Sequence, residues 1–162
     1  MRIKSILMIN IYTDGASSGN PGPGGFGVIL QSGKHYKEIS EGYRKTTNNR
    51  MELLAVITGL ESIKKPGQEI MIYSDSKYII DSVDKKWVFN WVKTNFKDKK
   101  NKDLWLRFLA VYKMHKIRFT WIKGHNGHPE NERCDELAVE ASKQKNLLID
   151  AYFEKEELKL NL

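Results

Sequence analysis

Two aspartates occupy the same place in two similar stretches of this chain. Asp14 and Asp75 each follow a short apolar run and a hydroxyl residue, Thr13 in the first stretch and Ser74 in the second. Such runs predict strands, and ligands of open α/β sheets lie outside the carboxyl ends of strands. Two carboxylates held there cost free energy unless a cation lies between them. The matched pair therefore predicts a metal site, whereas either Asp alone would be expected only to open a turn.

Two further carboxylates lie in the first turns of predicted helices. Glu52 follows the capping residues Thr46 and Thr47 at the start of a predicted helix, where the helix dipole or a capping role would also explain it. Asp135 lies about two turns into a predicted helix that begins at Pro129. Glu52 is thus a candidate third metal ligand, with the capping role as the alternative.

The elements that must position these residues alternate between strands and helices. Strands are expected at residues 8–14, 26–30, 35–43, 70–74 and 116–122, and helices at residues 48–65, 77–83, 104–111 and from residue 129 onward. Residues 15–25 are rich in glycine and proline and are expected to form a loop. This loop lacks the Lys-Ser/Thr ending of a P-loop, so a nucleotide cradle is not favoured.

Composition and charge indicate the class of partner. The 162 residues are 40% hydrophobic, enough for one domain with a core, and carry a net charge of +7. Residues 85–102 hold seven lysines and one aspartate, with Trp87 and Trp91 among them. Lysines interleaved with aromatic residues suit contacts with a nucleic-acid backbone, although a solvated face and a core would explain each feature separately.

Cysteine usage and hydropathy indicate the compartment. The single cysteine, Cys134, excludes an internal disulfide and favours a reducing compartment. No apolar run approaches the length of a transmembrane helix, so we expect no membrane partner and a cytoplasmic protein. His125 and His128 could ligate zinc, but no further His or Cys pair completes such a site.

Four segments together resemble the type 1 ribonuclease H family, and bacterial ribonuclease HI in particular. They are residues 12–16, 47–53, 73–76 and 124–135, and the resemblance runs from about Met8 to about Lys145. It implies a ribonuclease H fold, an α/β fold whose five-stranded mixed sheet has three antiparallel strands followed by two parallel ones, with helices on both faces. The implied function is an endoribonuclease that hydrolyses the RNA strand of RNA–DNA hybrids and leaves 5′-phosphate and 3′-hydroxyl ends.

The resemblance also assigns the catalytic residues. The family's four metal-binding carboxylates fall on Asp14, Glu52, Asp75 and Asp135, and its mobile loop histidine falls on His125. The implied cofactor is Mg²⁺, two ions in each active site, with Mn²⁺ as the alternative. One ion would activate water and the other would stabilise the leaving oxygen.

The family's substrate contacts carry over to three groups of residues. The contacts with 2′-hydroxyl groups fall on Asn20, Asn48 and Asn49, and the DNA phosphate pocket falls on Lys45, Thr47 and Asn101. The remaining contacts fall on Lys77, which replaces a frequent glutamine, and on Trp87 and Trp91 of the basic handle. Lys45 stands where arginine is usual, so the bidentate fork of a guanidinium is absent from this pocket.

The expected organisation is a single ribonuclease H domain at residues 1–150, with the handle at about residues 85–102. A tail at residues 151–162 receives no role from the sequence. A handle within the chain favours an enzyme that acts alone, as a monomer. The alternatives are a DNA-cutting resolvase or integrase relative, an inactive hybrid-binding module and a structural basic protein. Asn20, Asn48 and the histidine loop argue against the first, and the complete set of carboxylates argues against the other two.

Overall fold

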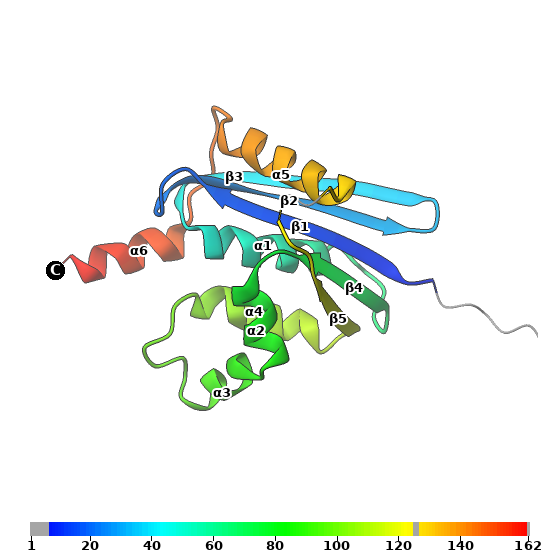
Figure 1. Cartoon of the computed structure of the whole chain (residues 1–162). Coiled ribbons are helices and arrows are strands. Elements are labelled where there is room, and N and C mark those ends of the chain that lie inside the picture. The colour runs from blue at the N-terminus through cyan, green and yellow to red at the C-terminus, as the bar shows by residue number, and fades with distance from the viewer. Residues whose placement is uncertain (1–6, 125–126, 162) are drawn as a thin grey trace, which may run out of the picture.

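The computed structural model describes residues 7–124 and 127–161, in which one mixed sheet carries helices on both faces (Figure 1). The strands are β1 (Ile9–Ser17), β2 (Gly22–Ser32), β3 (His35–Thr46), β4 (Glu69–Ser74) and β5 (Lys116–Trp121). The helices are α1 (Asn48–Glu61), α2 (Lys77–Asp84), α3 (Trp87–Lys93), α4 (Lys102–Tyr112), α5 (Pro129–Ser142) and α6 (Ala151–Leu160). None of the helices in the described ranges combines the length and apolar character that crossing a lipid bilayer requires.

The strand order β3-β2-β1-β4-β5 places β1 in the middle of the sheet. β1 pairs antiparallel with β2 and parallel with β4, β2 pairs antiparallel with β3, and β5 pairs parallel with β4. The predicted fold class, three antiparallel strands followed by two parallel ones, is confirmed. The central position of β1 explains its apolar run, because a central strand is covered on both faces.

The two faces of the sheet are covered by different helices. α5 packs against β1, β2 and β3 on one face, and α1 packs against β1 and β2 on the other, with α4 against α1 (Figure 1). The main core lies on the α1 side. Its largest fully buried side chains are Trp105, Phe26, Phe108, Ile11, Met51, Leu53 and Ile57.

Two glycines let helices approach the sheet closely beside the carboxylates. A Cβ on Gly15 would lie 2.4 Å from the backbone nitrogen of Glu52, and a Cβ on Gly27 would lie 2.3 Å from the carbonyl oxygen of Cys134. Both distances are far below van der Waals contact. Glycine at these positions therefore sets how near α1 and α5 come to β1 and β2.

β1 extends further than the sequence predicted. The strand continues to Ser17 in antiparallel pairing with β2, so Asp14 lies within the strand, opposite Gly27, and not at its end. The expected loop at residues 15–25 was wrong, because Ala16 and Ser17 pair with glycines of β2 and only residues 18–21 connect the strands. The parallel pairing of β1 with β4 does end at Tyr12, and Asp14 lies just beyond it.

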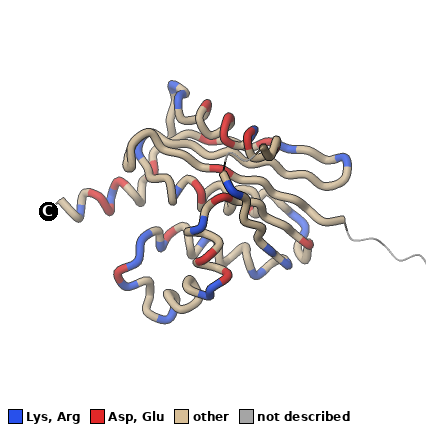
Figure 2. The backbone as a smooth tube through the Cα atoms, viewed as in Figure 1, with Lys and Arg blue, Asp and Glu red and all other residues tan. Residues whose placement is uncertain are grey.

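The handle and the C-terminal tail both carry helices. The handle consists of α3 and the turn that follows it, which lie away from the sheet and are rich in lysine (Figures 1 and 2). Asn95, Phe96, Asp98 and Asn101 have positive φ angles in this turn. The tail, for which the sequence predicted no structure, forms α6 over residues 151–160.

Candidate active site

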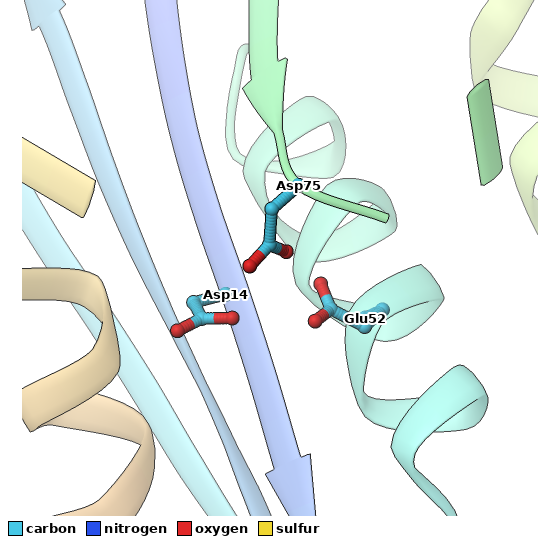
Figure 3. Close-up of side chains that lie close together, drawn as sticks. All are labelled: Asp14, Glu52 and Asp75. Atoms are coloured by element: carbon cyan, nitrogen blue, oxygen red, sulfur yellow. The ribbon is translucent and has the colours of Figure 1, made fainter. Parts of the chain in front are cut away.

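Three carboxylates from three elements meet at the edge of the β1–β4 parallel pair. Asp14 of β1, Glu52 of α1 and Asp75, directly after β4, each offer an oxygen within 4.8 Å of the other two. Figure 3 shows the three carboxyl groups pointing toward one another. The sequence predicted the Asp14–Asp75 pair from its two matched strands, and the structure brings that pair together.

Local structure fixes where each carboxylate stands. Thr47 caps α1 by accepting a hydrogen bond from the Arg50 backbone N–H, which places Glu52 in the second turn of the helix, facing β1. Glu52 takes no part in this cap, so the capping explanation of Glu52 is wrong. Asp14 accepts a hydrogen bond from the Gly15 N–H at 3.0 Å.

The carboxylates repel one another in a site where Asp14 and Glu52 are both buried. Burial first, and then the charges of Asp75 and Asp135, raise the pKa of Asp14 from its ordinary 3.8 to about 7. Burial first, and then the charges of Asp14 and Asp75, raise the pKa of Glu52 well above its ordinary value. Within the described part of the chain, Glu52 Oε2 is also a buried oxygen with no hydrogen-bond partner. Hard oxygen ligands, an orphaned buried oxygen and like charges fit a divalent cation.

Asp135 borders the same site from α5. It lies outside the 4.8 Å cluster, but it lines a hollow with Asp14 and Asp75, and a second hollow on the α1 side with the same two residues. The first hollow also receives Glu132 of α5. His125, the predicted catalytic histidine, lies outside the described residues.

The predicted 2′-hydroxyl contacts lie together beside the second hollow. Asn20 Oδ1 accepts a hydrogen bond from the Asn48 backbone N–H at 3.1 Å. Asn48 Oδ1 in turn accepts from the backbone N–H and the hydroxyl of Ser17, at 2.7 and 2.9 Å. Asn48 and Asn49 line the hollow that holds the three carboxylates. These contacts fix the Asn48 amide next to the candidate metal site.

Two of the three predicted phosphate-pocket residues, Thr47 and Asn101, contact Arg50. Thr47 accepts from the Arg50 N–H, and Asn101 Oδ1 accepts from Arg50 Nη1 at 3.3 Å. Lys45 lies two residues before Thr47 and pairs with Glu157 of α6.

The sequence did not single out Arg50. Its side chain is only 3% exposed and pairs with Asp103 at 2.7 Å and Asp150 at 2.6 Å. Its position beside core residues of α1 was a signal that could have identified it, because a buried arginine needs acidic partners.

Lys77 lies at the rim of the second hollow, above an aromatic ring that the sequence did not identify. Its ammonium group is 4.0 Å from the ring centroid of Trp121, at the end of β5. The indole Nε1 of Trp121 donates a hydrogen bond to the Asp75 carbonyl oxygen at 3.3 Å. A cation–π contact of this kind holds the lysine near the carboxylates.

The two tryptophans of the handle have different surroundings. Trp87 is 42% exposed, with the Lys85 ammonium 5.2 Å from its ring. Trp91 packs edge-on against the fully buried Trp105, with ring centroids 6.0 Å apart, and Lys99 approaches its ring. Trp87 therefore offers a surface for a ligand, whereas Trp91 mainly joins the handle to the core.

Comparison with known proteins agrees with this geometry. The family model described as RNase H matches residues 7–143. Ribonuclease H of Desulforamulus reducens is 52% identical over 147 residues, covering 88% of this chain and 92% of that protein. Ribonuclease HI of Haemophilus ducreyi is 51% identical over 135 residues, covering 80% and 87%.

Solved structures give the same result. LC9-RNase H1, described as a type 1 RNase H with the type 2 active-site motif, is similar with a TM-score of 0.76 and 28% identity, covering 95% of this chain and 82% of that one. LC11-RNase H1 in complex with an RNA/DNA hybrid is similar with a TM-score of 0.63 and 27% identity, covering 82% and 95%.

Proposed function

Because this chain belongs to the ribonuclease H family and is a ribonuclease H, we propose that it hydrolyses the RNA strand of RNA–DNA hybrids by two-metal-ion chemistry, leaving 5′-phosphate and 3′-hydroxyl ends. The observation that carries this proposal is the cluster of Asp14, Glu52 and Asp75 within 4.8 Å, where the parallel pairing of β1 with β4 ends. A similar protein, LC11-RNase H1, is described in complex with an RNA/DNA hybrid, which supports the choice of substrate.

The carboxylates are the proposed metal ligands. Asp14, Glu52 and Asp75, with Asp135 from α5, would hold two Mg²⁺ ions, with Mn²⁺ as the alternative. When bound, divalent ions supply charge neutralisation at the phosphate and activation of water. The carboxylates themselves orient the site, because three of them are fixed by β1, α1 and the end of β4. His125 is proposed to assist proton transfer and product departure.

Selectivity for RNA in a hybrid needs a group that reads the 2′-hydroxyl. We assign this role to Asn20, Asn48 and Asn49, since the first two are joined by a hydrogen bond and the last two line the carboxylate hollow. An amide can both donate to and accept from a 2′-hydroxyl.

The DNA strand is assigned to a different part of the surface. Lys45, Thr47 and Asn101 would bind a DNA phosphate. Trp87 and Trp91 would contribute on the handle, whereas Lys77, at the rim of the second hollow, would contact the hybrid near the carboxylates. The charge of residues 85–102, a net +6 from seven lysines and one aspartate, supports this role for the handle.

The test is cleavage of one labelled RNA in four forms: single-stranded, paired with RNA, paired with DNA, and as the corresponding all-DNA duplex, each with Mg²⁺ or with a chelator. We expect cutting only in the hybrid, only in the RNA strand and only with metal. End labelling of the products, with phosphatase treatment as the control, checks the 5′-phosphate. Tight hybrid binding without cutting would support the inactive binding module, and cutting of the DNA duplex would support a resolvase-like activity.

A further inference from the structure

The C-terminal helix α6 places acidic side chains against the basic residues that lead into the proposed phosphate pocket. Arg44 and Lys45, near the end of β3, pair with Glu154 and Glu157 of α6. The Arg44–Glu154 contact is bidentate, with three nitrogen–oxygen distances between 3.0 and 3.2 Å. α6 lies beyond residues 7–143, the part of the chain that matches the family model.

The beginning of α6 is held firmly in place. Asp150 caps the helix by accepting from the Phe153 N–H, and it also accepts hydrogen bonds from the Thr46 hydroxyl at 2.8 Å and from Arg50. Ahead of it, Leu148 exchanges backbone hydrogen bonds with Gly42 and Arg44 of β3, each at 2.9 Å. The acidic residues of α6 therefore face β3 because the preceding segment is bonded to it.

The net charge of α6 together with its N-cap residue Asp150 is opposite in sign to that of the rest of the chain. Residues 150–161 contain four carboxylates, including Asp150, and two lysines, a net charge of −2, in a protein of net charge +7. Figure 2 shows these acidic positions along the helix. Arg44 and Lys45 retain exposed side chains, 56% and 44%, so solvent and a ligand can reach both.

We infer that Glu157 of α6 competes with a DNA phosphate for Lys45 and thereby sets how tightly the hybrid binds. This inference rests on the proposed role of Lys45 in the phosphate pocket. A carboxylate paired with the ammonium group cancels its charge and places a negative charge where a phosphate would approach. The hybrid must therefore either displace Glu157 or bind beside it at a cost.

The size of the effect follows from the exposure of the pair. The side chains of Lys45 and Glu157 are 44% and 27% exposed, and ion pairs that solvent reaches are worth at most about 1 kcal/mol, which corresponds to an affinity change of up to about fivefold. A lysine freed to contact a phosphate adds up to about 0.9 to the slope of log affinity against log salt concentration. Both effects act on substrate binding and leave the carboxylate cluster unchanged.

The experiment compares Glu157→Gln with Glu156→Gln in steady-state hybrid cleavage at several salt concentrations. The control removes the same charge from the neighbouring residue of α6, Glu156, whose ion pair among the described residues is with Lys159 at 3.2 Å, whereas Lys45 pairs with Glu157. We expect Glu157→Gln to lower KM about two- to fivefold, to steepen the salt dependence of kcat/KM and to leave kcat unchanged. Glu156→Gln should change KM by less than the Glu157 variant.

A third variant, Lys45→Ala, separates the inference from the function on which it rests. Lys45→Ala should raise KM, and an unchanged KM would remove Lys45 from the phosphate pocket and overturn the inference with it. If Lys45→Ala raises KM while Glu157→Gln behaves like Glu156→Gln, the competition is refuted and the assignment of Lys45 stands. A higher KM for Glu157→Gln would also refute it, because Glu157 would then be positioning Lys45. Wild-type protein that does not cleave hybrids would contradict the proposed function itself.

Discussion

Replacing Asp14 by asparagine should abolish cleavage and at the same time stabilise the metal-free protein. Asparagine has nearly the shape of aspartate but carries no charge, so it removes one of the like charges that meet within 4.8 Å. Hybrid binding should survive, because the proposed substrate contacts on Asn48 and Lys77 do not depend on Asp14. Loss of activity combined with a gain in stability is the signature of a carboxylate placed for function.

The magnitude follows from the pKa of Asp14, which burial and neighbouring carboxylates raise from 3.8 to about 7. A shift of that size corresponds to an upper bound of about 4 kcal/mol, since each unit is about 1.4 kcal/mol. The repulsion is shared with Glu52 and Asp75, so we expect about half of it from one substitution. For a domain of this size, about 2 kcal/mol raises the melting temperature by roughly 4 to 8 °C.

The sign of the pH dependence is fixed by the direction of the shift. A carboxyl group whose pKa is higher in the folded state binds protons more tightly when folded, so the metal-free protein should lose stability as pH rises from about 4 to about 7. The Asp14→Asn variant should lose less over the same range. Above pH 7 the full difference between the two proteins should remain.

The assay is thermal unfolding in chelator at pH 8, with Asp81→Asn as the control. Asp81 is partly exposed on α2 and pairs with Lys85 at 3.7 Å, so its substitution should change stability by no more than about 0.5 kcal/mol. Adding Mg²⁺ should raise the melting temperature of the wild type more than that of Asp14→Asn. A metal-free Asp14→Asn protein less stable than the wild type, or one that retains full activity, would refute this account of the site.

Three further variants test the surroundings of the site. Replacing Lys97, Lys99 and Lys100 of the handle by alanine should raise KM and flatten the salt dependence of kcat/KM; a large loss of kcat at saturating hybrid would contradict a purely binding role. Gly27→Ala should lower stability by more than about 2 kcal/mol in denaturant unfolding, because the added Cβ would lie 2.3 Å from a backbone oxygen of α5; an unchanged midpoint would show that α5 shifts freely. Lys77→Gln should raise KM a fewfold with kcat retained, and a loss of kcat alone would assign the lysine to the chemical step.

The two matched strands of the sequence were sufficient to predict the Asp14–Asp75 pair. The reason is physical: the parallel pairing of β1 with β4 ends at Tyr12 and Tyr73, and Asp14 and Asp75 each lie two residues beyond that last pair, so the shared register brings them together although β1 itself continues past Asp14. The assignment of Glu52 to the metal site depended on the resemblance, because a carboxylate early in a helix is also explained by the helix dipole or by a capping role. The structure removed that explanation when it placed Thr47, and not Glu52, in the cap.

Other features could not be predicted because they depend on residues distant in sequence. Arg50 is buried through partners 53 and 100 positions away. The extension of β1 depends on β2, since the glycines that suggested a loop provide the ladder partners of Ala16 and Ser17. None of the described residues of α6 is buried. The helix therefore has no buried apolar stripe, which is the feature by which a sequence usually indicates a packed helix.

Arg50 links the starts of three helices. Its guanidinium joins Asp150, which caps α6, to Asp103 in the first turn of α4, while its backbone N–H completes the cap of α1. Arg50 thus contacts three helix starts around the proposed phosphate pocket, two through its guanidinium and one through its backbone N–H, and a buried charge with two acidic partners is strongly destabilising if either partner is lost. The position of Glu157 relative to Lys45 is therefore set from the interior of the protein. Competition between α6 and a phosphate can accordingly occur by movement of two partly exposed side chains, Lys45 and Glu157, without release of the helix.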